Sequence, residues 1–252
     1  KQAVSLSDRV RSIVLGSLLG DGSLKIHPGY KNARYSFRHS EIQKEYFFWK
    51  VLELREIAAD SSVFHQPNDG YGRNDKLRFQ SAALPTLTEL YNLTHKRGQF
   101  EIRRSWLNLL TPLSLAVWWC DDGSIIGNGR KGVLCTDGFD EPSVKRLARY
   151  LQVVWNIAAH VGAVNRSRRY GRREYYRLWL STEELKKFLR IILPHIPVPS
   201  MIKKTLLIYK DPQIQQRWIS EAKALSKFSA AEIEAALEEK RKKWQRTLQK
   251  MI

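Results

Sequence analysis

Two stretches of this sequence repeat one pattern, an apolar run typical of a buried helix that ends in an aspartate followed by a glycine. The first covers residues 14–22 and ends at Asp21-Gly22; the second covers residues 115–123 and ends at Asp122-Gly123. A carboxylate that closes a buried helix is costly unless a cation meets it. The repeat therefore predicts two related halves whose acids meet at a shared site.

A second pair of similar runs is separated by the same distance in the sequence, about a hundred residues. The run Leu77-Arg-Phe-Gln-Ser returns as Arg177-Leu-Trp-Leu-Ser, and each run is strand-like and precedes a helical stretch. A period this long indicates domain-sized halves and not a solenoid. We expect an α+β fold with two pseudo-symmetric repeats over residues 1–108 and 109–211, and a charged helical extension over residues 212–252.

Each half reads as helix, two strands, helix, two strands and helix. Expected helices cover Val10–Leu19, Ser40–Leu54, Leu84–Leu93, Glu141–Trp155 and Glu183–Leu193. Expected strands cover Ser23–Lys25, Arg34–His39, Val63–Gln66, Lys76–Gln80, Gly132–Cys135, Gly162–Arg168 and Tyr175–Leu180. In the helix over residues 40–54, the predicted apolar face consists of Ile42, Tyr46, Trp49 and Val51.

The extension contains a capping box, Ser229 with Glu232, which predicts a helix over Glu232–Leu248. Its apolar positions are sparse. Three interpretations stay open: the helix packs on the main body, reaches nucleic acid through the basic run 240–243, or is a solvated surface helix.

Charge is the strongest compositional signal, with a net charge of +18. A basic chain of this size favours a nucleic-acid partner, because phosphates supply a matching polyanion. The two cysteines, Cys120 and Cys135, show no zinc-binding spacing, and no apolar run is long enough to predict a membrane span. We expect an intracellular protein, from a prokaryotic cytoplasm or an organelle (mitochondrion or chloroplast).

Small residues at Gly16, Gly20 and Ala116 would let the two motif helices approach closely and bring Asp21 and Asp122 together. Two neighbouring carboxylates repel each other unless one is protonated or a divalent cation lies between them. Oxygen ligands point to Mg²⁺, for which Mn²⁺ or Ca²⁺ can substitute in binding. Facing a basic surface, such a centre suits phosphodiester hydrolysis. The structural alternative is that each aspartate only closes a helix end.

From residue 8 to residue 210, the paired motifs resemble the signature helices of LAGLIDADG homing endonucleases, in the single-chain form with two motifs. The resemblance implies two αββαββα repeats, each with a saddle-shaped antiparallel sheet, around central motif helices. It implies a monomeric, metal-dependent enzyme that cuts both strands of a long, asymmetric DNA target for intron homing. Asp21 and Asp122 would bind the metal, with main-chain carbonyls of Gly20 and Asp121 as further ligands.

The resemblance also places one lysine of each half near the scissile phosphates. Lys204 fits this position in the second half, with Lys203 adjacent. In the first half, counting back from the second motif reaches Gln99, and Lys96 or Arg97 fits only with a small gap. Such a lysine stabilises the charged transition state or simply contacts a phosphate.

The sheets of the family lie along the major groove of double-stranded DNA, and this sequence supplies basic and amide side chains on the expected strands and turns. Which of them read bases stays open, because alternate residues of a strand face opposite sides. The candidates are Lys25, His27, Lys31, Arg34, Arg38, Arg73, Lys76, Arg78, Gln80, Arg130, Lys131, Arg166, Arg168, Arg169, Arg172, Arg173 and Arg177.

Three alternatives remain. Intron RNA is a further candidate partner, because a maturase of this fold would use the same basic sheets. A non-catalytic DNA-binding regulator is the second. The third is a basic structural protein whose aspartates cap helices. The presence of both Asp21 and Asp122 favours cleavage, since neither form of binding alone requires two acids.

Overall fold

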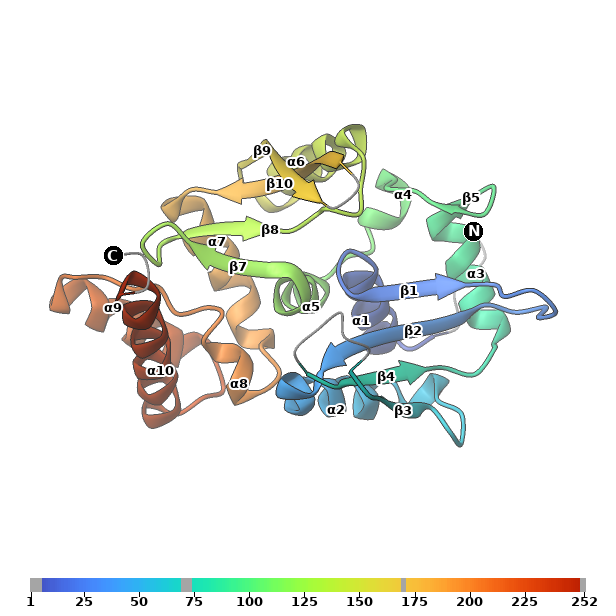
Figure 1. Ribbon diagram of the computed structural model, residues 1–252, viewed down its shortest axis with the longest axis horizontal. Coiled ribbons are helices and arrows are strands. Elements are labelled where there is room, and N and C mark those ends of the chain that lie inside the picture. Colours follow the sequence, from blue (N-terminus) through green and yellow to red (C-terminus); the bar gives the residue numbers. More distant parts are fainter. Residues whose placement is uncertain (1–5, 69–73, 169–170, 250–252) are drawn as a thin grey trace.

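Two sheets, each covered by helices on one face, flank a central pair of helices (Figure 1). The computed structural model describes residues 6–68, 74–168 and 171–249. Within these residues, the strands form two four-stranded antiparallel sheets, with orders β1-β2-β4-β3 and β7-β8-β10-β9, and a two-stranded sheet, β5-β6. The α+β architecture with two αββαββα repeats is confirmed.

The first half begins with the motif helix α1 (Asp8–Leu18), which Ser7 caps by accepting from the Val10 amide. Its remaining elements follow the expected order. They are β1 (Gly22–Lys25), β2 (Arg34–Ser40), the 3₁₀ turn η1 (Glu41–Gln43), α2 (Lys44–Glu53), η2 (Arg55–Ile57), β3 (Val63–Gln66), β4 (Lys76–Gln80), α3 (Pro85–Thr94), β5 (His95–Lys96), β6 (Gln99–Phe100) and α4 (Arg104–Leu107).

The second half begins with the motif helix α5 (Pro112–Asp122), where Thr111 and Ser114 form a capping box and Pro112 occupies the first turn. Its other elements are β7 (Gly123–Ile126), β8 (Lys131–Leu134), α6 (Glu141–Trp155), β9 (Ala159–Arg168), β10 (Gly171–Leu180), α7 (Thr182–Ile192), η3 (Leu193–His195) and α8 (Pro199–Ile202). The β9–β10 hairpin is longer than predicted, because its pairing continues from Ala159 to Arg168.

The two motif helices pack directly on each other at the centre of the molecule (Figure 1). A Cβ atom at Gly16 would lie 2.3 Å from the Ser114 carbonyl oxygen, and one at Gly20 would lie 2.6 Å from Cβ of Asp121. Ser114 also donates to the Ser12 carbonyl across the interface, at 2.8 Å. The predicted close approach of the two helices is confirmed.

The glycines that follow the two aspartates have a steric role. Neither Gly22 nor Gly123 has a positive φ. A Cβ atom at Gly123 would instead lie 2.3 Å from the ring of Trp119, and one at Gly22 would lie 2.8 Å from the backbone of Ser17. Each strand therefore leaves its motif helix so close to the last turn that only glycine fits.

The predicted apolar face of the helix over residues 40–54 is confirmed for Tyr46, Trp49 and Val51, which pack on the core, and is wrong for Ile42. Ile42 is 75% exposed, and the buried positions of α2 are Tyr46, Phe47 and Lys50. Ile42 lies in η1, before α2 begins, so it does not share the buried face of the helix. A lysine, not only apolar side chains, thus faces the protein interior.

The extension folds into two helices, α9 (Pro212–Leu225) and α10 (Ala230–Gln249), of which only the second was predicted in detail. The capping box is present, with the Ser229 amide donating to Glu232 at 2.8 Å. Ile233 and Leu237 are buried, and α10 packs against α8 and α9. Of the three interpretations, packing on the main body is confirmed.

Among the residues that the structure describes, no helix combines the length and the apolar character that crossing a membrane needs.

Candidate active site

The motif aspartates lie where the two central helices end, and the two helices bring one acid from each half. Asp21 follows α1, and Asp122 is the last residue of α5. A cleft of about 590 Å³ opens beside Asp122, lined by residues of both halves that include Gly20, Cys135 and His95, while Asp21 lines a second cleft together with Arg38 and His39. The centre of the molecule therefore combines acidic groups with open space.

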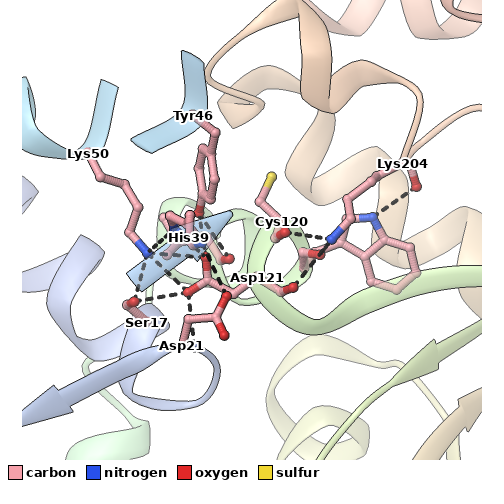
Figure 2. Close-up of polar contacts among 10 residues, drawn as sticks. Ser17, Asp21, His39, Tyr46, Lys50, Cys120, Asp121 and Lys204 are labelled. Carbon is pink, nitrogen blue, oxygen red and sulfur yellow. Dashed lines mark hydrogen bonds and ion pairs between the residues drawn. The ribbon is translucent and has the colours of Figure 1, made fainter. Parts of the chain in front are cut away.

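Asp121 has a different environment from its two neighbours in the motifs. Its carboxylate is fully buried and lies 3.1 Å from the Lys50 ammonium. It also accepts from Ser17 and Tyr46, each at 2.9 Å (Figure 2). A buried ion pair is stable only when further hydrogen bonds satisfy both charges, and this one meets that condition. The side chain of Asp121 is thus fully engaged within the protein.

Asp21 is more open and contacts the same cluster through a histidine. Its side chain is 41% exposed, and its Oδ2 atom lies 3.3 Å from His39 Nδ1, while His39 Nε2 lies 3.5 Å from the Lys50 ammonium. Burial alone would raise the pKa of Asp21, but the contact with His39 and the charges of His39 and Lys50 lower it overall. Asp21 is therefore ionised and ready to accept a cation.

The surroundings of Asp122 shift its pKa in the opposite direction to that of Asp21. Burial raises the pKa of its carboxyl to about 7, and the negative charges of Asp21 and Asp121 act in the same direction. The carboxylates of Asp21, Asp121 and Asp122 are close enough to repel one another. A bound divalent cation would relieve this repulsion. Carboxylate oxygens such as those of Asp21 and Asp122 are ligands of the kind that hard divalent cations prefer.

Lys204 reaches the end of α5 from the second half, as expected. Its ammonium donates to the Cys120 carbonyl at 2.5 Å and to the Asp121 carbonyl at 3.3 Å (Figure 2). A cation at the carboxyl end of a helix is stabilised by the exposed carbonyls and the helix dipole. The carbonyl of Asp121, expected as a metal ligand, therefore also accepts from Lys204.

The structure does not bring the two first-half candidates into contact with either aspartate. Lys96 and Gln99 face each other in the β5–β6 hairpin. Both are exposed and line a neighbouring cleft together with Phe139 and Asp140. The cationic group that the first half brings to the acids is Lys50, which sits on α2, far earlier in the repeat than the position expected for the catalytic lysine.

Candidate DNA-binding residues of the first half lie together on the open face of their sheet. Along β2 and β4 the core side chains alternate with polar ones, so that Tyr35, Phe37, Leu77 and Phe79 are buried. The opposite face carries Lys25, Arg34, Arg38, Lys76, Arg78 and Gln80. His27 and Lys31 follow in the exposed β1–β2 turn.

Arg38 stands directly opposite Arg78 in this sheet. Like charges at paired positions of neighbouring strands destabilise a sheet unless an anion separates them. The pairing therefore concentrates positive charge on the open face of this sheet, where Arg38 donates to Gln66 and Arg78 donates to Gln80.

The second sheet is less uniform. Arg130 and Lys131 are exposed at the β7–β8 turn, but Arg177 is only 12% exposed and forms a bidentate ion pair with Asp137 at 2.5 Å. Arg177 is therefore a poorer phosphate ligand than its sequence suggests. Arg73 and Arg169 lie outside the described residues, and for Arg166, Arg168, Arg172 and Arg173 only the backbone of the β9–β10 hairpin is described.

Sequence reasoning missed His39 and Lys50. Sheet register shows why repeat symmetry could not find His39: Gly22 pairs with Phe37 and Gly123 with Leu134, so the second-half position equivalent to His39 is Thr136. A signal for Lys50 did exist, since it lies one helical turn after Tyr46 and shares its face.

Comparisons with known proteins agree with this geometry. A family model described as the LAGLIDADG DNA endonuclease family matches residues 11–188. The structure of the homing endonuclease I-WcaI bound to its DNA recognition sequence has the same fold, with a TM-score of 0.67 at 20% identity over 81% of this chain and 88% of that one.

Curated relatives come from two groups. The protein RecA of Mycolicibacterium fallax is 30% identical over 87% of this chain and 52% of its own length. The cytochrome b mRNA maturase bI2 of Debaryomyces hansenii is 26% identical over 78% of this chain and 73% of its own length. The chain spans about half the length of the RecA proteins it matches. Because the family model covers most of the sequence, the chain belongs to the LAGLIDADG DNA endonuclease family.

Proposed function

We propose that this protein is a site-specific endonuclease that binds a long, asymmetric double-stranded DNA target and hydrolyses both strands with a divalent metal ion. The observation that carries the proposal is that Asp21 and Asp122, one from each half, lie at the ends of two packed helices, close enough for the charge of Asp21 to raise the pKa of Asp122. Family membership and the basic face of the first sheet support it. Intron homing as a monomer, inside a prokaryotic cell or an organelle, belongs to the same proposal.

Asp21 and Asp122 would hold Mg²⁺, with the main-chain carbonyls of Gly20 and Asp121 as additional ligands. When bound, the metal supplies an activated water and neutralises charge on the phosphate. The side chain of Asp121 takes no part in this, because Lys50, Ser17 and Tyr46 occupy its oxygen atoms. Lys204 adds positive charge beside the second acid, where it would stabilise the charged transition state.

The basic side chains on the open face of the first sheet would position the duplex. Arg38, Arg78 and Lys76 contact phosphates or guanine edges, and Gln80 can pair with adenine. Two sheets that each follow about one helical turn of DNA predict a target of about 20 base pairs.

The test is cleavage of a randomised plasmid library with Mg²⁺, followed by sequencing of the cut ends, with EDTA as the metal-free control. We expect cuts at one long sequence that EDTA abolishes. The Asp122→Asn protein should keep its DNA affinity in Ca²⁺, while its rate of double-strand cleavage should fall by at least about 10²-fold. Losing a residue that only hydrogen-bonds to a metal ligand typically costs less than this. Asp60→Asn, an exposed charge-matched control, should cleave normally. Full activity of Asp122→Asn would remove Asp122 from the site.

An RNA-binding maturase is the second candidate, favoured by the similarity to the bI2 maturases of Debaryomyces hansenii and Saccharomyces cerevisiae. In that case the protein would bind structured intron RNA tightly, and Asp122→Asn would leave its effect on splicing unchanged. No DNA cleavage together with such RNA binding would favour this function over the first.

A further inference from the structure

The stretch from Lys203 to Tyr209, called here the Lys204 segment, has no helix or strand of its own. Its backbone carbonyls therefore need partners from elsewhere. Trp119 of α5 donates to the Lys204 carbonyl at 3.0 Å. The Ile208 amide donates to the Gly129 carbonyl in the β7–β8 turn. The carbonyls of Lys203, Thr205, Leu206 and Leu207 accept from the extension, so the two C-terminal helices support the chain that carries the candidate catalytic lysine.

Lys240 of α10 makes the most central of these contacts. Its amine donates to the Leu206 carbonyl at 2.6 Å and to the Lys203 carbonyl at 3.0 Å, on both sides of Lys204. Burial lowers the pKa of this amine to about 7. Even a neutral amine has two hydrogens to donate, so both hydrogen bonds persist without the charge.

Helix α9 holds the rest of the segment. The indole of Trp218 donates to the Thr205 carbonyl at 3.3 Å. Gln215, which is 4% exposed, donates to the Leu207 carbonyl at 3.1 Å and accepts from the Tyr209 amide at 2.9 Å. Each donor is a buried side chain, which makes the support rigid.

Where the segment sits determines where the Lys204 ammonium lies. That ammonium contacts three successive carbonyls, those of Trp119, Cys120 and Asp121, at the end of α5 beside Asp122. Figure 2 shows the side chain reaching these carbonyls from the opposite side to Lys50. A shift of the segment would move this charge away from the acids.

We infer that Lys240 is a positioning residue: it fixes the Lys204 segment, and through it the Lys204 ammonium, at the motif acids. The expected effect of Lys240 on cleavage rests on the proposed endonuclease function. The structural part of the inference, the restraint on Lys204, can be measured without DNA. The C-terminal extension is then part of the machinery of the second half and not an appendage.

The test compares Lys240→Met, which keeps the aliphatic stem and loses the donor, with Lys242→Met. Lys242 lies on the same helix, is 63% exposed and pairs only with Glu238 among the ion pairs of the described residues. In single-turnover cleavage of the target found above, Lys240→Met should be about 10-fold to 100-fold slower, the cost of misplacing a catalytic group by about 1 Å. DNA affinity in Ca²⁺ should stay unchanged, and Lys242→Met should match the wild type in both measurements. Lys240→Arg, which keeps donors at this position, should recover part of the rate.

The second readout is the rate at which reductive methylation with formaldehyde and cyanoborohydride labels Lys204, followed by peptide mass spectrometry without DNA or metal. We expect Lys204 to be labelled several-fold faster in Lys240→Met and at the wild-type rate in Lys242→Met. The labelling rate can be measured even if the wild-type protein cuts no DNA. Absence of cleavage would overturn the proposed endonuclease function but not the restraint on Lys204. If Lys240→Met does not fold, Lys240→Gln replaces it under the same criteria. Unchanged labelling together with unchanged cleavage, even with a lower melting temperature, would overturn the inference.

Discussion

At the residue scale, three aspartates within two motifs have three different environments. Asp121 is buried against Lys50, Asp21 is open beside His39, and Asp122 is half-buried with a raised pKa. The ion pair of Asp121 keeps one negative charge compensated inside the protein. The other two acids are left to share whatever cation enters.

Asp122 makes the stability of the metal-free protein depend on pH. Its pKa is about 7 when folded, against 3.8 for an ordinary aspartate, so the folded state binds the proton more tightly. The contribution of this group to stability is therefore complete below about pH 4 and is lost as the pH rises through about 7. We expect Asp122→Asn to remove this loss. Chemical unfolding in EDTA between about pH 4 and pH 8 measures it, with Asp60→Asn as a control that keeps the wild-type slope.

The sequence was sufficient to place Asp21, Asp122 and Lys204 near one another, because each lies in a recognisable run or at a fixed place in the repeat. Their roles in catalysis stay predictions. The sequence was not sufficient for His39 and Lys50. Their contacts depend on the register of β2 and on how α2 packs against the motif helices, which local patterns do not determine. Counting along the repeat predicts Gln99, and Lys96 only with a small gap, but the β5–β6 hairpin directs both residues toward another cleft.

At the element scale, the close contact between α1 and α5 sets the distance between the two halves. Gly16 lies against the backbone of Ser114, where no side chain can move aside to make room. The interface therefore tolerates small residues only, as the sequence pattern indicated.

We expect Gly16→Ala to destabilise the protein by about 1–3 kcal/mol, the usual cost of overpacking a tight interface. Alanine is otherwise the better helix former, so the loss would not come from helix propensity. Gly138→Ala is the matched control, because a Cβ atom there meets nothing within 4 Å. Urea unfolding of the two variants and the wild type gives the comparison. Equal stability of all three would show that the helices can separate slightly without cost.

Most helices and strands could be predicted because the repeat gives each one twice. Helix α9 falls within the helical extension predicted over residues 212–252, but it lies outside the repeat, so its own bounds were not predicted, although Asp211 before Pro212 is a good helix start. The tertiary role of α10 could not be read from its sparse apolar positions. It depends on Lys240, whose buried contacts look like ordinary surface charge in the sequence.

At the scale of the whole molecule, the net charge of +18 and the basic sheet face should make DNA binding strongly salt-dependent. We expect the logarithm of the affinity to fall linearly with the logarithm of the salt concentration. Arg78→Ala should reduce that slope by about 1 if Arg78 contacts a phosphate. Arg9→Ala is the control, because Arg9 lies on α1 and pairs with Glu53. Fluorescence anisotropy with the cognate duplex in Ca²⁺ measures both slopes, and an unchanged slope in Arg78→Ala would contradict this assignment.

The buried pair of Lys50 and Asp121 makes the two halves of the chain non-interchangeable. Lys50 belongs to one half and Asp121 to the other, at the position where the first motif has Gly20. A symmetrical dimer of two first halves would enclose two lysines with no carboxylate between them. A symmetrical dimer of two second halves would place two copies of the Asp121 carboxylate in a space that now holds one, and it would contain no Lys50 to neutralise them. Each would bury uncompensated charge, which folded proteins rarely tolerate. The halves have become complementary in the way that subunits of a heterodimer are, so neither can any longer replace the other.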